Sequence, residues 1–200
     1  YQGLACSSSD GEGGGPDIEG VDGGYGQYLR AMFHLQCLST DEAVCCWNDQ
    51  TLQDMHGLAW TTSDVFIAAF YYRIFYQISA FNEFIRQANK AKIDLPKKDQ
   101  WIAEARALRA YCWLDAIDNY GNVPFGDENS AVGADIPQQI SRKDLFAYIE
   151  SECLDLINGN DLYEVGQGEY GRVNKGMVVM VLGLNGGIIL VANKKEYRSE

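Results

Sequence analysis

The sequence predicts an all-α protein made of long antiparallel helices joined by extended loops. Apolar residues recur at helical spacing through several long segments. Alternation of apolar and polar residues never persists long enough to indicate a strand, and the absence of a βαβ pattern excludes dinucleotide-binding folds. Consecutive helices of this length predict tetratricopeptide-like helix pairs, although the repeat signature of about 34 residues is not clean.

Composition limits the possible partners. The chain has 200 residues, of which 46% are apolar, enough for one domain of ordinary size or part of a larger one. Its net charge of -12 argues against nucleic acid and against direct binding to anionic lipid, because both attract Lys and Arg. A neutral ligand or another protein fits better.

Residues 1–24 are predicted to be a flexible leader, because they are rich in glycine and polar residues. Within the leader, Cys6 follows Leu4 and Ala5, and a small residue before a cysteine resembles a bacterial lipobox. In that case Cys6 carries the lipid of a lipoprotein tether. The apolar segment that precedes a lipobox is absent, so a plain disordered leader is the alternative.

Helix boundaries follow from local chemistry. Asp64 is an expected N-cap, since its carboxylate can accept hydrogen bonds from the amides of a first helical turn. Gly121 is an expected C-cap, and Ser141 with Asp144 approximates a capping box. Four helices are predicted over residues 25–38, 65–91, 98–119 and 141–158, with an irregular stretch from 39 to 61.

The apolar segment 176–192 is interrupted by Gly183, Asn185, Gly186 and Gly187. As a helix it falls short of the about 30 Å hydrocarbon core of a bilayer. We expect a buried core helix weakened by glycine rather than a membrane span.

The segment TDEAVCCWND at residues 40–49, together with the end of the helix before it, contains possible metal ligands. His34, Cys37, Cys45 and Cys46 form an H-x2-C-x7-C-C pattern of possible ligands. Adjacent cysteines seldom bind one tetrahedral ion, because their side chains point apart. The sequence therefore predicts no metal site and no cofactor.

Catalysis is equally weakly supported. Asp41 and Glu42 could serve a carbohydrate-active enzyme, but nothing singles out a pair of carboxylates held at catalytic separation. Neither histidine belongs to a nucleophile motif. The prediction is a protein that is not an enzyme, with an enzyme using Asp41 or Glu42 kept as an alternative.

Trp47 lies in a polar stretch beside Asn48 and Asp49. An aromatic ring stacks on the C–H face of a sugar, while amide and carboxylate groups bind the surrounding hydroxyls. A neutral polyhydroxylated ligand therefore suits these residues. The alternative is that Trp47 folds back as a lid on the helical core.

Five blocks, in order, resemble the N-terminal half of the SusD/RagB family. They are YGQYLRAMFHLQCLSTDEAVCCWND, W-x3-D-x6-YYRIFYQISAFNEFIRQA, EARALRAYCWLDAIDNYGNVPF, SRKDLFAYIESE and YGRVNKG. The family comprises glycan-binding lipoproteins on the outer membrane of Bacteroidetes. The resemblance implies a non-catalytic protein of the cell surface that binds polysaccharide or oligosaccharide and delivers it to a SusC-like TonB-dependent transporter.

The resemblance also implies individual roles. Trp47 and Asn48, and more weakly Asp49, are carried over as carbohydrate-binding residues, and Cys6 as the lipidated residue, so that a lipid anchor is the link to the membrane. Residues 25–200 are expected to form an incomplete N-terminal helical domain, because family members are longer. A departure is the glycine-rich segment after YGRVNKG, which is usually alanine-rich. A helical scaffold that binds protein and no sugar remains an alternative.

Overall fold

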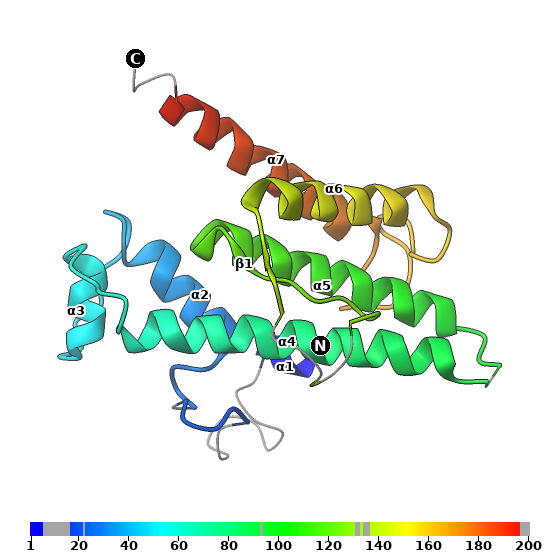
Figure 1. The fold of residues 1–200 in the computed structure, drawn as a ribbon, viewed down its shortest axis with the longest axis horizontal. Coiled ribbons are helices and arrows are strands. Elements are labelled where there is room, and N and C mark those ends of the chain that lie inside the picture. Colours follow the sequence, from blue (N-terminus) through cyan, green and yellow to red (C-terminus); the bar gives the residue numbers. More distant parts are fainter. Residues whose placement is uncertain (6–16, 22, 93, 131–132, 134–136, 197–200) are drawn as a thin grey trace. The chain divides into compact units, whose positions relative to one another are not determined.

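The structure is a computed structural model that describes residues 1–5, 17–21, 23–92, 94–130, 133 and 137–196. Helices dominate these residues, and the strands are very short (Figure 1). The elements are α1 (Gln2–Ala5), α2 (Tyr28–Cys37), α3 (Gln50–His56), α4 (Val65–Lys90), α5 (Lys98–Tyr120), β1 (Val123–Pro124), β2 (Gln139–Ile140), α6 (Arg142–Asn158) and α7 (Lys175–Glu196). The all-α prediction is confirmed.

The chain divides into two compact units, residues 1–77 and 78–200. Helix α4 runs through the boundary, so its N-terminal half belongs to the first unit and its C-terminal half to the second. Asp64 caps α4 as predicted: its Oδ1 accepts from the amides of Phe66 at 2.9 Å and Ile67 at 3.3 Å. Its Oδ2 accepts from the hydroxyl of Thr51 at 2.6 Å, which ties α3 to the start of α4.

The first unit has an aromatic core between α2 and the N-terminal half of α4. The ring of Tyr28 meets Phe70 edge-on with centroids 5.3 Å apart, and His34 meets Phe66 in the same way at 4.7 Å. Phe66, Phe70 and Tyr28 are completely buried. Such aromatic pairs add to the stabilisation from area burial alone.

Helix α3 corrects the sequence prediction of an irregular stretch over residues 39–61. It buries Leu52 and Met55, which are three positions apart and therefore on one face. A helix of two turns with only two core residues gives too little periodicity to detect in a sequence. The rest of the stretch, residues 43–49 included, has no regular structure.

The second unit is a layer of antiparallel helices, in which α5, α6 and α7 pack against one another (Figure 1). Helix α5 is buried around most of its circumference, and its many alanines let neighbouring helices approach closely. Gly121 ends α5 with a φ of 74°, a backbone conformation that favours glycine, and Ser141 caps α6 by accepting from the amide of Asp144 at 3.1 Å. Both predicted caps are confirmed.

A buried ionic network joins α5 to its neighbours. Arg109 is 1% exposed and donates to Asn82 at 2.7 Å and to Glu152 at 3.2 Å, and it also pairs with Glu128. Arg106 binds the same Glu152 at 2.9 Å. Arg106 also pairs with Asp155 at 2.7 Å. Four partners around two arginines, namely Asn82, Glu128, Glu152 and Asp155, offset the cost of burying these charges.

Helix α7 forms as predicted, but it is not a helix buried on all sides. Val178 and Val181 are buried and Asn185 donates to the carbonyl of Phe146 on α6 at 3.2 Å. The opposite face exposes Val179, Met180 and Leu184, each by about half. An apolar composition indicates that a helix can be buried. How much of its surface is buried depends on how many other helices pack against it. Within the described residues, no helix is both long and apolar enough to cross a membrane.

Candidate functional site

Trp47, the central residue of the predicted site, lies in the irregular segment between α2 and α3. Ser39 and Thr40 follow the end of α2 and bind its last turn. The Ser39 hydroxyl donates to the carbonyl of Leu35 at 2.8 Å, and the Thr40 hydroxyl donates to that of Cys37 at 2.7 Å. The chain then leaves the helix, and the Trp47 side chain is 61% exposed. The alternative of Trp47 as a lid buried on the core does not fit this exposure.

Arg30 holds one side of the Trp47 ring. Its guanidinium carbon lies 5.6 Å from the centre of the Trp47 ring and 5.8 Å from that of Tyr25. Its Nη1 also donates to the carbonyl of Gly24 at 2.9 Å, which fixes the guanidinium in place. Cation–π contacts of this kind are worth about 0.5–1 kcal/mol at exposed sites. We call Tyr25, Arg30 and Trp47 the aromatic–arginine stack.

The sequence pattern does not indicate Arg30 or Tyr25 as site residues. Both lie in the segment that was assigned to a helix, where a charged residue usually marks a solvated face. The sequence signal for this contact is that Tyr25 and Arg30 lie close together near the start of α2. Such spacing is common in helices that bind no ligand.

Asn48 and Asp49 follow Trp47 directly, but they have different environments. Asn48 is exposed, and its Oδ1 accepts from the side chain of Gln53 at 2.9 Å. Asp49 occupies the N-cap position of α3, yet its carboxylate makes no capping hydrogen bond; its carbonyl accepts from the amides of Leu52 and Gln53. Trp47 and Asn48 therefore stand together on one exposed edge, and Asp49 starts the next helix.

The structure does not bring the candidate metal-binding and catalytic residues together in one site. Cys45 is half-buried and Cys46 exposed, and both are free thiols. Among the described residues there is no group of three or more His, Cys, Asp or Glu side chains that could hold a metal ion. Asp41 and Glu42 are exposed in the turn after α2. Cys6, the predicted lipidation site, lies outside the described residues.

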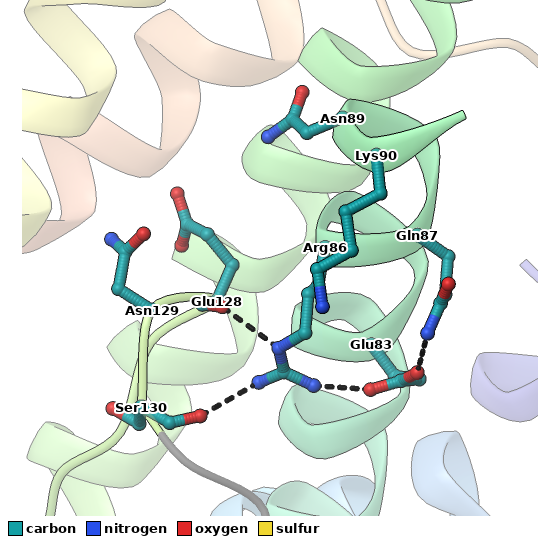
Figure 2. A pocket seen from close by; sticks show the side chains of 8 residues that line it. All are labelled: Glu83, Arg86, Gln87, Asn89, Lys90, Glu128, Asn129 and Ser130. Atoms are coloured by element: carbon teal, nitrogen blue, oxygen red, sulfur yellow. Dashed lines mark hydrogen bonds and ion pairs between the residues drawn. The ribbon is translucent and has the colours of Figure 1, made fainter. Parts of the chain in front are cut away.

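The second unit contains a polar pocket that the sequence analysis did not predict. Its volume is about 620 Å³, within the usual range for ligand sites. Figure 2 shows the side chains that line it. Every lining residue is polar. They are Glu83, Arg86, Gln87, Asn89 and Lys90 from α4, and Glu128, Asn129 and Ser130 from the loop after β1. We call this the polar pocket.

Arg86 organises the polar pocket, as the dashed lines in Figure 2 show. Its Nε donates to the carbonyl of Glu128 at 2.9 Å and its Nη2 to that of Ser130 at 3.0 Å, while Nη1 pairs with Glu83. The loop itself is held by Asp127, whose Oδ1 accepts from the amides of Asn129 at 2.9 Å and Ser130 at 3.0 Å. The pocket wall is thus fixed before any ligand arrives.

The carboxylates of this region are stabilised in their charged form. For Asp127, burial works to raise the pKa, but hydrogen bonds from Ser130 and Asn129 outweigh it and lower the pKa. For Glu128, burial likewise opposes ionisation, and the hydrogen bond and charge of Arg109 lower its pKa. A hydrogen bond from Gln87 and the nearby Arg86 lower the pKa of Glu83. All three side chains are therefore anionic at neutral pH.

Comparison with known proteins supports the family assignment. No family model matches the chain. The starch-binding protein SusD of Bacteroides thetaiotaomicron is 29% identical over the whole of this chain and 36% of its own length. The chain therefore spans about a third of the length of this curated relative.

Solved structures share the fold. Surface glycan-binding protein A from Bacteroides uniformis has a TM-score of 0.58 and 19% identity, over 66% of this chain and 30% of its own. A SusD-like carbohydrate binding protein from Bacteroides fragilis has a TM-score of 0.56 and 18% identity, over 82% of this chain and 38% of its own. At this identity the likeness establishes the fold only, which is that of the N-terminal part of SusD-like proteins.

The sequence match goes further than the fold. It runs through all 200 residues, and so includes the five sequence blocks and the aromatic–arginine stack. The whole chain therefore resembles part of a SusD-like protein in sequence, and most of it does so in fold.

Proposed function

We propose that this chain contributes to non-catalytic binding of a neutral polysaccharide or oligosaccharide, with Trp47 as the stacking platform. The observation that carries the proposal is the 61% exposure of a Trp47 side chain whose position is set by Arg30. The similarity to a starch-binding protein and to a surface glycan-binding protein supports the same ligand class.

The geometry suits a sugar for physical reasons. Sugar rings present C–H faces that pack on an aromatic ring, and a ring already fixed by Arg30 loses little side-chain entropy when it binds. Asn48 supplies an amide whose nitrogen can donate to a hydroxyl while Oδ1 accepts from Gln53. Asp49 adds a carboxylate next to this amide, which can accept a hydrogen bond from a sugar hydroxyl.

For the whole protein, we propose a lipoprotein at the cell surface that passes its glycan to a SusC-like TonB-dependent transporter in the outer membrane. Support comes from the family and from Cys6, which follows a small residue as a lipid-modified cysteine does. Palmitate labelling tests this part: the label should be lost in Cys6→Ser, and a label that persists contradicts lipidation at Cys6.

Affinity electrophoresis in gels that contain starch or another neutral polysaccharide tests the binding proposal. Retardation is expected for at least one polysaccharide, and Trp47→Ala should weaken binding about tenfold, equivalent to about 1.4 kcal/mol. Trp60→Ala is the matched control, because Trp60 is also exposed in the first unit, at 42%. Equal losses in both variants, or no retardation in any gel, would contradict the proposal. Release of reducing sugar would instead indicate an enzyme.

A further inference from the structure

The C-terminal half of α4 carries an apolar groove next to the polar pocket. The groove has a volume of about 290 Å³, and its lining includes Phe84, Leu95 and Trp101. These three side chains remain 44%, 43% and 36% exposed. Gln87 lines both the groove and the polar pocket, so the two adjoin at this residue of α4.

The charges of the polar pocket cancel. Glu83 and Glu128 contribute two negative charges, while Arg86 and Lys90 contribute two positive charges. The Arg86 guanidinium is already bonded to Glu83 and to the carbonyls of Glu128 and Ser130, so it cannot clamp an anion without breaking them. A phosphate, sulfate or acidic peptide therefore finds no surplus of positive charge, and a neutral ligand is favoured.

The remaining groups suit hydroxyls. Within the described residues the side-chain amide of Asn89 makes no hydrogen bond, and it carries no dashed line in Figure 2. Asn129 is presented by the Asp127-bonded loop, and its Nδ2 makes only a long bond of 3.3 Å to Asp127. Gln87 donates through Nε2 to Glu83 at 2.6 Å, and its Oε1 can accept. Each amide combines donor and acceptor atoms, as a hydroxyl partner requires.

We propose that the polar pocket and the apolar groove together form a second oligosaccharide subsite, centred on Gln87. Hydroxyl groups bind Asn89 and Asn129 in the pocket, and a neighbouring sugar ring packs its C–H face against Trp101 and Phe84 in the groove. All of these residues belong to the second unit, so the subsite goes beyond the function proposed for Trp47 and does not depend on it.

Side-chain amide and indole signals in NMR spectra of the ¹⁵N-labelled chain test the subsite directly. The probes are maltoheptaose, cellohexaose, xylohexaose and mannohexaose, with a tri-galacturonic acid as the charged comparison. At least one neutral oligosaccharide should shift the signals of Asn89, Asn129 and the Trp101 indole. The Trp47→Ala variant should keep these shifts, which separates the subsite from the Trp47 site.

Substitution supplies the second measurement. Asn89→Ala and Trp101→Ala should each raise the dissociation constant derived from these shifts about fivefold or more. Leu154→Ala is the matched control, because Leu154 on α6 is 44% exposed and lines neither the groove nor the pocket. The proposal is overturned if none of the four neutral probes shifts these signals, if only the galacturonate does, or if the shifts vanish in Trp47→Ala.

Discussion

Asp17 and Arg73 form a bidentate ion pair across 56 positions of the chain, with bonds of 2.7 and 2.5 Å. Arg73 is 1% exposed and also donates through Nε to the carbonyl of Gly26. The described end of the predicted leader is therefore bound to α4. A buried guanidinium needs such partners, because an unpaired charge in the interior is costly.

Replacing Asp17 by alanine should destabilise the first unit by about 3 kcal/mol, since Arg73 would keep the Gly26 carbonyl and the Tyr76 ring but lose its counter-charge. Urea denaturation followed by circular dichroism measures the loss. Glu19→Ala is the control, because Glu19 is an exposed acid two positions away. Similar midpoints for the two variants would show that the pair contributes little.

Arg109 should be the most sensitive polar position of the second unit. Arg109→Leu leaves Glu128 without its buried cation and Glu152 with Arg106 alone, and we expect a loss of about 3–5 kcal/mol. Lys97→Ala removes the exposed ion pair with Glu169 and should leave the denaturation midpoint nearly unchanged. If both variants behave alike, the network does not stabilise the helix layer.

His34 should make stability depend on pH above the range where carboxylates titrate. Burial against Phe66 and the neighbouring charge of Arg30 lower its pKa, so the folded chain binds this proton less readily than the unfolded chain does. The free energy of unfolding should therefore fall as pH drops from about 7.5 to about 5.5, through the ordinary pKa of histidine. His34→Gln should flatten this slope, whereas His56→Gln, at an exposed position, should not.

Two glycines should respond to alanine in opposite directions. Gly183 lies in α7 with no atom within 4 Å of an added Cβ, so Gly183→Ala should stabilise the helix by about 1 kcal/mol. Gly121 also has space, but its φ of 74° strains any other residue, and Gly121→Ala should destabilise by about 1 kcal/mol. Thermal denaturation of both variants checks the pair. Stabilisation by both substitutions would mean that the conformation at residue 121 carries no strain.

The parts of the fold that depend on neighbours in sequence could be predicted. Helix periodicity and the caps at Asp64, Gly121 and Ser141 are local features, and the structure has them where expected. Helix α3 was missed because two buried residues do not make a pattern. The extent of burial of α7 was missed because it depends on how many neighbours the helix has.

The candidate site could be predicted only in part. The composition of the loop indicated Trp47, but the contact with Arg30 depends on how α2 approaches the loop, which periodicity does not reveal. The polar pocket combines residues 83–90 with residues 128–130, and neither segment carries a recognisable motif. The roles of Trp47, Asn48, Asp49 and Cys6 remain predictions that the experiments above address.

The uncovered strip on α7, formed by Val179, Met180 and Leu184, has a practical consequence for colloidal behaviour. Apolar strips favour association between copies, and the net charge of -12 opposes it by mutual repulsion. At about 0.1 M ionic strength this repulsion reaches only about 10 Å, so salt weakens the force that keeps molecules apart and leaves the attraction between strips intact. Dilute buffers of low ionic strength are therefore the conditions in which the purified chain should stay monodisperse.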